Sequence, residues 1–206
     1  GEIENGEKIN VTVPTGNFGN ILAAYFAKQM GVPIDKLICA SNDNKVLYDF
    51  FKTGVYDKNR PFILTSSPSM DILISSNLER LIYLSTGCDA EETKKRMEEL
   101  SKDGKYSVTG EMRARMADFV GGYADQAANA AEIKRLYDET GYMIDTHTGV
   151  ASCVYHNYVK ETGDTKKTVI ASTASPYKFS RSVMEAIFGS EEGKGEFRSE
   201  ERRVGK

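Results

Sequence analysis

Residues 8 to 20 read KINVTVPTGNFGN, and this stretch decides the fold that the sequence predicts. Its first half, Lys8 to Val13, is rich in β-branched residues and runs into Pro14-Thr15-Gly16, which is typical of a strand ending in a turn. Apolar residues then recur at helical spacing from Ile21 to Met30, and Gly31 marks the end of the predicted helix. A loop with two glycines therefore joins a strand directly to the N-terminus of a helix.

The alternation of strand and helix continues along the chain. Leu37 to Ala40 is a short apolar run typical of a buried parallel strand, and the apolar spacing from Val46 to Phe51 predicts a second helix ending at Gly54. Further helices are predicted over 75–84, 89–102, 127–139, 150–160 and 177–189, and a strand is predicted over 167–172. Asp89 and Glu92 resemble a capping box. This order predicts an α/β fold with an open, mostly parallel sheet flanked by helices.

Composition narrows the functional classes. The chain has 206 residues, 40% of them hydrophobic, enough for one sizeable core or for one domain and part of another. A charged fraction of 28% and a net charge of −3 indicate no nucleic-acid footprint. Cys39, Cys88 and Cys153 are odd in number and widely spaced, which predicts reduced thiols and neither a disulfide framework nor a metal site. Without an apolar run near the roughly 20 residues of a membrane span, or a signal peptide, a soluble cytoplasmic protein is expected.

The loop at Gly16 and Gly19 predicts an anion site. Glycines let the backbone approach an anion closely, and the helix that follows presents unpaired N–H groups and the positive end of its dipole. The loop contains neither the GxxxxGK[ST] nor the GxGxxG nucleotide pattern, and the nearest cation downstream is Lys28. A phosphate monoester held by backbone amides fits better than a triphosphate. Ordinary turn chemistry is the alternative interpretation of a GxxG loop.

Four ordered blocks of sequence carry a family resemblance. They are VPTGNFGNILAAYFAKQMGVPIDKLICASNDN from Val13, SPSMDILISSNLERL from Ser67, DTHTGVA from Asp145 and STASPYKF from Ser172. Together they resemble the threonine synthases, which are fold-type II pyridoxal-phosphate enzymes. The resemblance implies that residues 1–192 are the C-terminal portion of a pyridoxal-phosphate-binding catalytic domain with an incomplete sheet. Residues 193–206 are expected to be a polar tail, disordered or non-native.

The resemblance also implies which residues bind the cofactor, pyridoxal 5'-phosphate. The loop residues match the cup that holds the cofactor phosphate, and they are Gly16, Asn17, Phe18, Gly19 and Asn20. Thr173 falls where the family places a hydroxyl against the pyridine nitrogen, with Ser172 as the neighbour most easily confused with it. A neutral hydroxyl does not force the ring nitrogen to stay protonated, so the ring is a weaker electron sink. From the residues alone, a strand-end residue bonded to its own turn is the favoured interpretation of Thr173.

Three further residues are candidates for contact with the substrate, and they are Asn77, Arg80 and His147. Arginine offers a planar fork of donors suited to a phosphate group. The plainer interpretations are a solvated arginine at a helix start, and a structural histidine before a helix that Thr148 caps. His156 is interpreted as a surface or packing residue.

No catalytic residue is nominated, because the family's cofactor-binding lysine is expected to precede this chain. Lys8, the lysine before the loop, lacks the Ser-Phe-Lys-Asp neighbours that the family implies. By resemblance, the intact enzyme converts O-phospho-L-homoserine and water to L-threonine and phosphate, and the fragment alone is expected to be inactive. Its expected partner is the missing N-terminal portion of the same enzyme, with no nucleic acid and no membrane. The alternatives are another fold-type II lyase, or a non-catalytic domain that binds a phosphate ligand.

Overall fold

The computed structural model describes residues 2–189, so the predicted tail at 193–206 lies outside the described residues. The chain builds a four-stranded sheet in the order β5-β2-β1-β6, in which every neighbouring pair is parallel. These strands are β1 (Ile9–Pro14), β2 (Ile34–Ser41), β5 (Phe119–Tyr123) and β6 (Thr168–Ile170). A smaller antiparallel pair joins β3 (Val55–Asp57) to β4 (Lys105–Ser107). The predicted α/β class with a mostly parallel sheet is confirmed.

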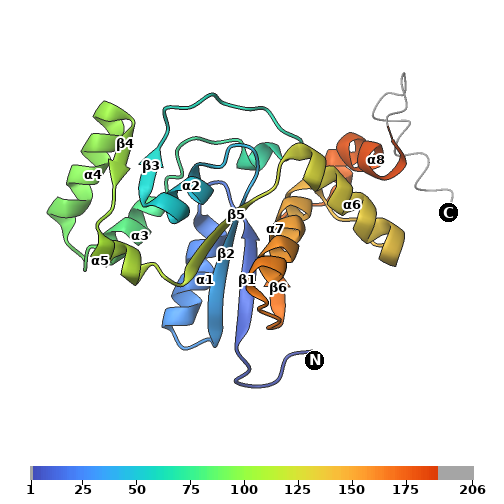
Figure 1. Cartoon of the computed structure of the whole chain (residues 1–206), viewed down its shortest axis with the longest axis horizontal. Coiled ribbons are helices and arrows are strands. Elements are labelled where there is room, and N and C mark those ends of the chain that lie inside the picture. Colours follow the sequence, from blue (N-terminus) through green and yellow to red (C-terminus); the bar gives the residue numbers. More distant parts are fainter. Residues whose placement is uncertain (1, 190–206) are drawn as a thin grey trace.

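Helices cover both faces of the large sheet (Figure 1). On one face lie α1 (Gly19–Gln29) and α2 (Val46–Thr53), and beyond them α3 (Leu78–Ser85), α4 (Ala90–Asp103) and α5 (Gly110–Arg115). The other face packs against α7 (Thr146–Thr162), with α6 (Gln126–Thr140) and α8 (Ser180–Phe188) outside it. Single 3-10 turns, η1 (Pro68–Met70) and η2 (Pro176–Phe179), precede α3 and α8. No described helix combines the length and apolar character that crossing a membrane requires.

The period-2 pattern of β2 explains why the sheet is covered twice. Leu37 and Cys39 are fully buried in the core beneath α1 and α2, whereas Ile38 and Ala40 are fully buried against α7. Successive side chains of a strand point to opposite faces. A near-continuous apolar run is therefore what a parallel strand with helices on both faces requires.

Strand β5 is a difference from the sequence prediction, which assigned no element to residues 119–123. Its two central residues are glycines, which weaken a strand signal. The structure gives the reason for them. A Cβ on Gly121 would lie 3.2 Å from the Tyr48 Cα atom of α2, and one on Gly122 would lie 2.4 Å from Val154 Cγ1 of α7. Both helices approach this strand too closely for larger residues.

Two helix starts also differ from prediction. Asp89 caps α4 by accepting from the N–H groups of Glu91 and Glu92, but the reciprocal bond of a capping box is absent because Thr86 Oγ1 accepts the Asp89 N–H at 3.1 Å. Helix α7 begins at Thr146, four residues before the predicted start. Its cap is Asp145 instead of Thr148. The predicted strand over 167–172 shortens to Thr168–Ile170, after which the chain enters the loop that carries Thr173.

Candidate functional site

The candidate site lies at the carboxyl edge of the large sheet, in the loop that joins the end of β1 to the start of α1. Asn17, Gly19 and Asn20 are exposed, Gly16 is half-buried and Phe18 is 1% exposed. Ligands of open parallel sheets bind at this edge. In Figure 1 the same edge is crossed by the long connection between β3 and α3. Lys8 precedes β1 and so lies at the opposite end of that strand from the loop.

The sharp turn of this loop falls on Phe18, not on a glycine. Phe18 has φ of 62°, the left-handed region that bulky residues seldom adopt. Its ring is buried 6.0 Å from the Phe51 ring and 5.6 Å from the Phe119 ring. Packing of the ring thus holds a backbone conformation that the residue would otherwise avoid, and the turn presents the start of α1 outward.

The backbone N–H groups of residues 16 to 20 are unpaired within the described part of the chain. Thr15 N–H bonds to Ala40 O at 2.8 Å and Leu22 N–H to Phe18 O at 3.2 Å, but the residues between them donate to no described acceptor. Unpaired N–H groups at a helix N-terminus favour an anion. The loop therefore carries unpaired donors at a partly exposed helix start, a cradle that suits an anion.

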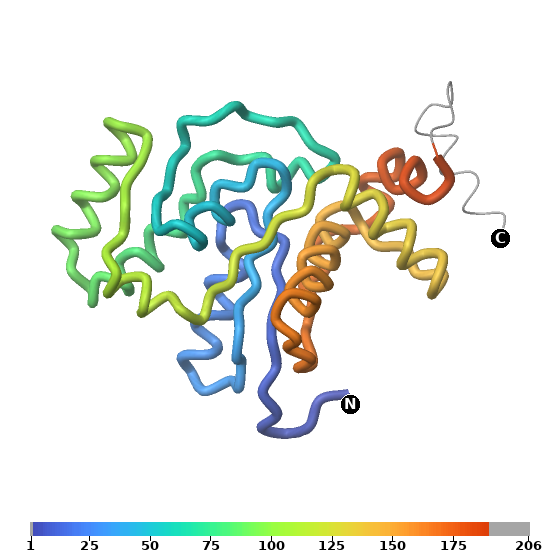
Figure 2. Tube along the Cα trace, in the orientation of Figure 1, coloured from blue at the N-terminus to red at the C-terminus, as the bar shows by residue number. Residues whose placement is uncertain are grey.

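The connection from β3 to α3 forms the rim of this cradle. Figure 2 traces it from β3 across the top of the sheet towards α6 and back to α3. A Cβ on Gly16 would lie 2.5 Å from Ser69 O, so the returning chain touches the loop at a point where only glycine fits. Ser75 Oγ donates to Gly16 O at 2.9 Å, and Asn77 Nδ2 donates to Asn17 O at 2.8 Å. The loop is thus held in place by residues about 60 positions away.

The predicted substrate residues Asn77 and Arg80 lie together beside the cradle. Arg80 is exposed, and one of its guanidinium nitrogens donates to Asn77 Oδ1 at 2.5 Å. Asn77 in turn contacts Asn17, so the guanidinium is connected to the loop through one side chain. By contrast Lys28, the nearest downstream cation in the sequence, is paired with Asp118 at 2.9 Å and donates to Asp35 O. Arg80 is therefore the better-placed cation.

Thr173 follows β6, the strand adjacent to β1. Thr12 pairs with Ile170, and Ala171 N–H donates to Thr12 O at 2.9 Å, so parallel pairing brings residues 171–173 beside the end of β1. The Thr173 side chain is exposed and makes no hydrogen bond with any residue of the described range, whereas Ser172 Oγ lies 3.3 Å from Thr148 Oγ1. Of the two neighbouring hydroxyls, that of Thr173 is the one left open to a ligand.

Asp145 and His147 lie at the start of α7, directly behind the rim. Asp145 is fully buried and His147 is 2% exposed. The His147 Nδ1 atom is 3.0 Å from Asp145 Oδ1, and Nε2 accepts the Ser69 N–H at 3.2 Å. Both ring nitrogens are therefore engaged inside the chain. The contact of His147 with the substrate stays a prediction.

A buried polar cluster that sequence reasoning did not assign holds the outer turn of the connection. Asn42 Nδ2 donates to Asp71 Oδ1 at 2.8 Å, and Asn44 Nδ2 donates to the same oxygen at 3.0 Å. Thr65 adds a bond from its hydroxyl at 2.7 Å and one from its N–H to Asp71 Oδ2 at 2.8 Å. Both asparagines follow directly after β2, at the edge of the sheet where ligands of parallel sheets bind. This short run of amide and acidic side chains is the sequence pattern from which the cluster could have been predicted.

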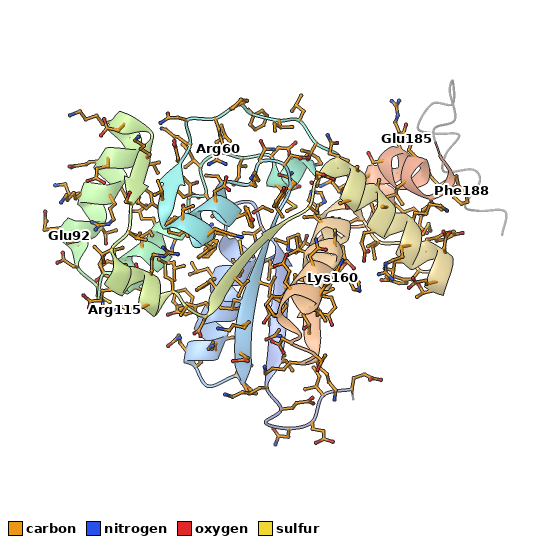
Figure 3. All side chains as sticks on the ribbon, viewed as in Figure 1. Arg60, Glu92, Arg115, Lys160, Glu185 and Phe188 are labelled. Carbon is orange, nitrogen blue, oxygen red and sulfur yellow. The ribbon has the colours of Figure 1, made fainter. Side chains whose placement is uncertain are left out.

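Two anchors fix the ends of the same connection. Arg60, labelled in Figure 3, pairs with Asp49 of α2 at 2.7 Å. At the other end the Tyr56 hydroxyl donates to Leu73 O at 2.9 Å and accepts the Ser75 N–H at 2.8 Å. Burial raises the pKa of Tyr56 to about 12, so the phenol stays protonated.

Within the described residues no group of His, Cys, Asp and Glu side chains could hold a metal ion.

The chain is similar in sequence and in structure to known proteins. No family model matches the chain. Human threonine synthase-like 1 is 41% identical over 189 residues, covering 91% of this chain and 25% of that protein. Threonine synthase of Saccharomyces cerevisiae is 37% identical over 201 residues, covering 90% of this chain and 39% of that protein. The crystal structure of pyridoxal-phosphate-bound threonine synthase from Brucella melitensis superposes with a TM-score of 0.83 at 35% identity, covering 94% of this chain and 41% of that one.

The fold defines the class: an α/β domain of the fold-type II kind, with a mostly parallel sheet flanked by helices. Within that class the chain is similar in sequence and in fold to the C-terminal portion of the threonine synthases. It spans about a quarter of the threonine synthase-like proteins that it matches and about two fifths of the threonine synthases.

Proposed function

We propose that this chain contributes the phosphate cup and the ring-nitrogen contact of the cofactor site of a threonine synthase. The intact enzyme would be a carbon–oxygen lyase that uses pyridoxal 5'-phosphate to convert O-phospho-L-homoserine and water to L-threonine and phosphate. One observation carries the proposal: an exposed loop with unpaired N–H groups lies beside the end of a neighbouring strand that offers a free hydroxyl. The similarity to threonine synthases supports it.

The residues fit the cofactor at both ends. Gly16, Asn17, Phe18, Gly19 and Asn20 would hold the phosphate through backbone donors, which suits a monoester that needs no metal ion. Thr173 would contact the pyridine nitrogen through a hydroxyl that no described residue occupies. The parallel pairing of β1 with β6 sets the two ends side by side.

When bound, pyridoxal phosphate supplies an electron sink for negative charge at the substrate's α carbon. The residues of this chain bind and orient that group. Because Thr173 offers a neutral hydroxyl instead of a carboxylate, it does not force a proton onto the ring nitrogen. Proton transfers would then depend on bases from the remaining portion of the enzyme, where the cofactor-binding lysine is expected.

Asn77 and Arg80 are the residues proposed to receive the substrate's phosphate. Both lie at the rim, and the guanidinium is exposed. An exposed arginine to which the described residues offer one side-chain acceptor keeps donors available for a bidentate contact with a phosphate group. Its hydrogen bond to Asn77 would also couple occupation of that contact to the position of Asn17.

The two alternatives differ from the proposal in testable ways. Another fold-type II lyase would share the cup, but the match to threonine synthases also covers the SSNLERL and STASPYKF blocks that a shared cup does not explain. A non-catalytic phosphate-binding domain would bind phosphate without preferring the pyridine ring.

Binding of pyridoxine 5'-phosphate tests the proposal. This analogue lacks the aldehyde, so it cannot react with surface lysines, and the chain has no tryptophan to interfere with its fluorescence. We expect the full chain to bind it more tightly than inorganic phosphate, and to lose binding when the analogue is replaced by pyridoxine. Equal affinity for pyridoxine and its phosphate would overturn the cup assignment. Equal affinity for inorganic phosphate and the analogue would favour the non-catalytic domain.

A further inference from the structure

We propose that Asp145 fixes the two ends of the cofactor site relative to each other, acting through His147 towards the phosphate cup and through Thr148 towards residues 172–173. His147 and Thr148 are then positioning residues, neither of which touches the cofactor. This inference rests on the proposed function, because it assigns the two ends of the site to the cup and to Thr173.

Asp145 is the hub of the arrangement. Its carboxylate is fully buried at the start of α7. Oδ1 accepts the His147 N–H at 2.8 Å and lies 3.0 Å from His147 Nδ1, while Oδ2 accepts the Thr148 hydroxyl in a short hydrogen bond. Burial opposes ionisation of Asp145, but these hydrogen bonds outweigh it and hold its pKa below the ordinary value. The carboxylate therefore remains ionised, and an ionised carboxylate only accepts.

The first arm runs from Asp145 to the cup. Since Asp145 only accepts, the His147 Nδ1 atom carries the proton, which leaves Nε2 as an acceptor for the Ser69 N–H at 3.2 Å. The carbonyl oxygen of the same residue, Ser69, lies 2.5 Å from the position that a Cβ atom on Gly16 would take. His147 thus holds the segment that presses on the first residue of the cup.

The second arm runs from Asp145 to the ring-nitrogen end. The Thr148 hydroxyl is the donor both towards Asp145 Oδ2 and, at 3.3 Å, towards Ser172 Oγ. Because a hydroxyl has one proton, the two acceptors share it, and Thr148 links Asp145 to Ser172. Holding Ser172 orients the backbone just before Thr173 and leaves the Thr173 hydroxyl free. The two arms begin at consecutive residues, His147 and Thr148, in the first turn of α7.

Four variants of the full chain separate positioning from plain stability. His147→Leu removes the acceptor for Ser69, whereas His147→Gln keeps an oxygen that can accept the same N–H. Thr148→Val removes the second arm. His156→Gln is the control, because His156 lies on the same helix and contacts Glu132 and Ser152 away from the cup. Each is titrated with inorganic phosphate, which reports on the cup, and with pyridoxine 5'-phosphate, which reports on both ends. Hydrogen exchange is followed in peptides covering 65–74 and 171–176.

The expected pattern is selective. His147→Leu weakens inorganic phosphate binding about tenfold, the loss expected when a buried donor is left unpaired, and speeds exchange in 65–74. His147→Gln restores most of both. Thr148→Val leaves inorganic phosphate binding unchanged, weakens pyridoxine 5'-phosphate about tenfold and speeds exchange in 171–176. His156→Gln changes neither affinity.

The contrary results are distinct. If the wild-type chain binds both probes and His147→Leu binds them equally well, or Thr148→Val weakens both to the same extent, the inference alone is overturned. If the wild-type chain binds neither probe, the proposed function is overturned and the inference with it. Should His147→Leu fail to fold, His147→Gln and Thr148→Val carry the test. The inference requires both variants to keep inorganic phosphate binding, and it requires Thr148→Val to weaken the binding of pyridoxine 5'-phosphate.

Discussion

Gly16 is the residue at which the cup is most sensitive to a small change. A Cβ there would meet the backbone oxygen of Ser69 at 2.5 Å, and backbone can give way only if the whole segment shifts. We expect Gly16→Ala to lower the free energy of unfolding by about 1–3 kcal/mol, the usual cost of overpacking, and to weaken inorganic phosphate binding at least severalfold. Chemical denaturation and calorimetric titration measure the two effects.

Gly19 provides the matched control for this prediction. A Cβ at Gly19 has its nearest neighbour, Asn77 Nδ2, at 3.7 Å, which is ordinary van der Waals contact. Because Gly19 is also the first residue of α1, alanine should cost little there and the unfolding free energy should change by less than about 0.5 kcal/mol. Equal destabilisation by the two alanines would show that contact with Ser69 is not what requires glycine at position 16.

Phe18 combines an unfavourable left-handed backbone conformation with favourable burial of its ring. Two substitutions that remove the ring separate these effects. Both Phe18→Ala and Phe18→Gly remove the ring from its contacts with Phe51 and Phe119, which should cost about 3–5 kcal/mol. Only glycine relieves the left-handed conformation at φ 62°. We therefore expect Phe18→Gly to be the more stable of the two by about 1 kcal/mol, in reverse of the usual order. An alanine variant as stable as the glycine variant would show that the loop relaxes when the ring is removed.

At the scale of elements, the contact between α6 and α7 contains a buried carboxylate. Glu132 accepts from Ser152 at 2.6 Å and from Arg135 at 2.8 and 2.9 Å, and His156 Nδ1 lies 3.0 Å away. Burial opposes ionisation of Glu132, but the hydrogen bonds from Arg135 and Ser152 outweigh it and lower its pKa below the ordinary value of 4.5.

The sign of the resulting pH dependence follows from this shift. A carboxyl group with a lowered pKa in the folded state stabilises the fold above its unfolded pKa, and the stabilisation is lost as pH falls through the folded pKa. We expect Glu132→Gln to cost about 1–3 kcal/mol at pH 7, and the difference from wild type to shrink below about pH 4. Denaturant unfolding of both proteins across that range measures it. Glu139→Gln, at the exposed partner of Arg135, should change stability by less than about 0.5 kcal/mol, and a constant Glu132→Gln deficit at all pH values would contradict the account.

The same elements show how far the sequence predicts the fold. Strands β1 and β2 and the helices beside them were predicted because their apolar patterns are continuous and are bounded by Gly and Pro. Strand β5 was not predicted, because its residues Gly121 and Gly122 are required by the close approach of α2 and α7, which are distant in sequence. Strands β3 and β4 span three residues each, too short for any periodicity.

For the site, the sequence predicts the loop but not what holds it. The glycines at 16 and 19 lie three positions apart in one loop, so the local sequence pattern suffices to propose an anion cradle. The partner of His147 is a backbone N–H 78 positions away, which no residue pattern reveals. Contact between His147 and the substrate stays a prediction, and both of its ring nitrogens have partners inside the described chain.

At the scale of the whole molecule, the described part of the large sheet ends in two edge strands. Strands β5 and β6 each have one neighbour in the described sheet, and the matched threonine synthases are more than twice as long as this chain. Exposed edges of a parallel sheet are normally covered. This arrangement agrees with the proposal that the remaining portion of the enzyme supplies both that cover and the cofactor-binding lysine.

Activity should therefore depend on joining the two portions. We expect the isolated chain to release no phosphate from O-phospho-L-homoserine, because the proposed function gives it residues that bind and orient the cofactor and assigns the cofactor-binding lysine to the remaining portion of the enzyme. A chimera in which residues 2–189 replace the matching portion of yeast threonine synthase should release phosphate and form threonine. The yeast remainder alone is the control and should be inactive. Introducing Gly16→Ala into the chimera should lower its cofactor affinity, measured by the pyridoxal phosphate concentration for half-maximal activity. Phosphate release by the isolated chain would show that it already holds a complete site and would overturn the half-site assignment.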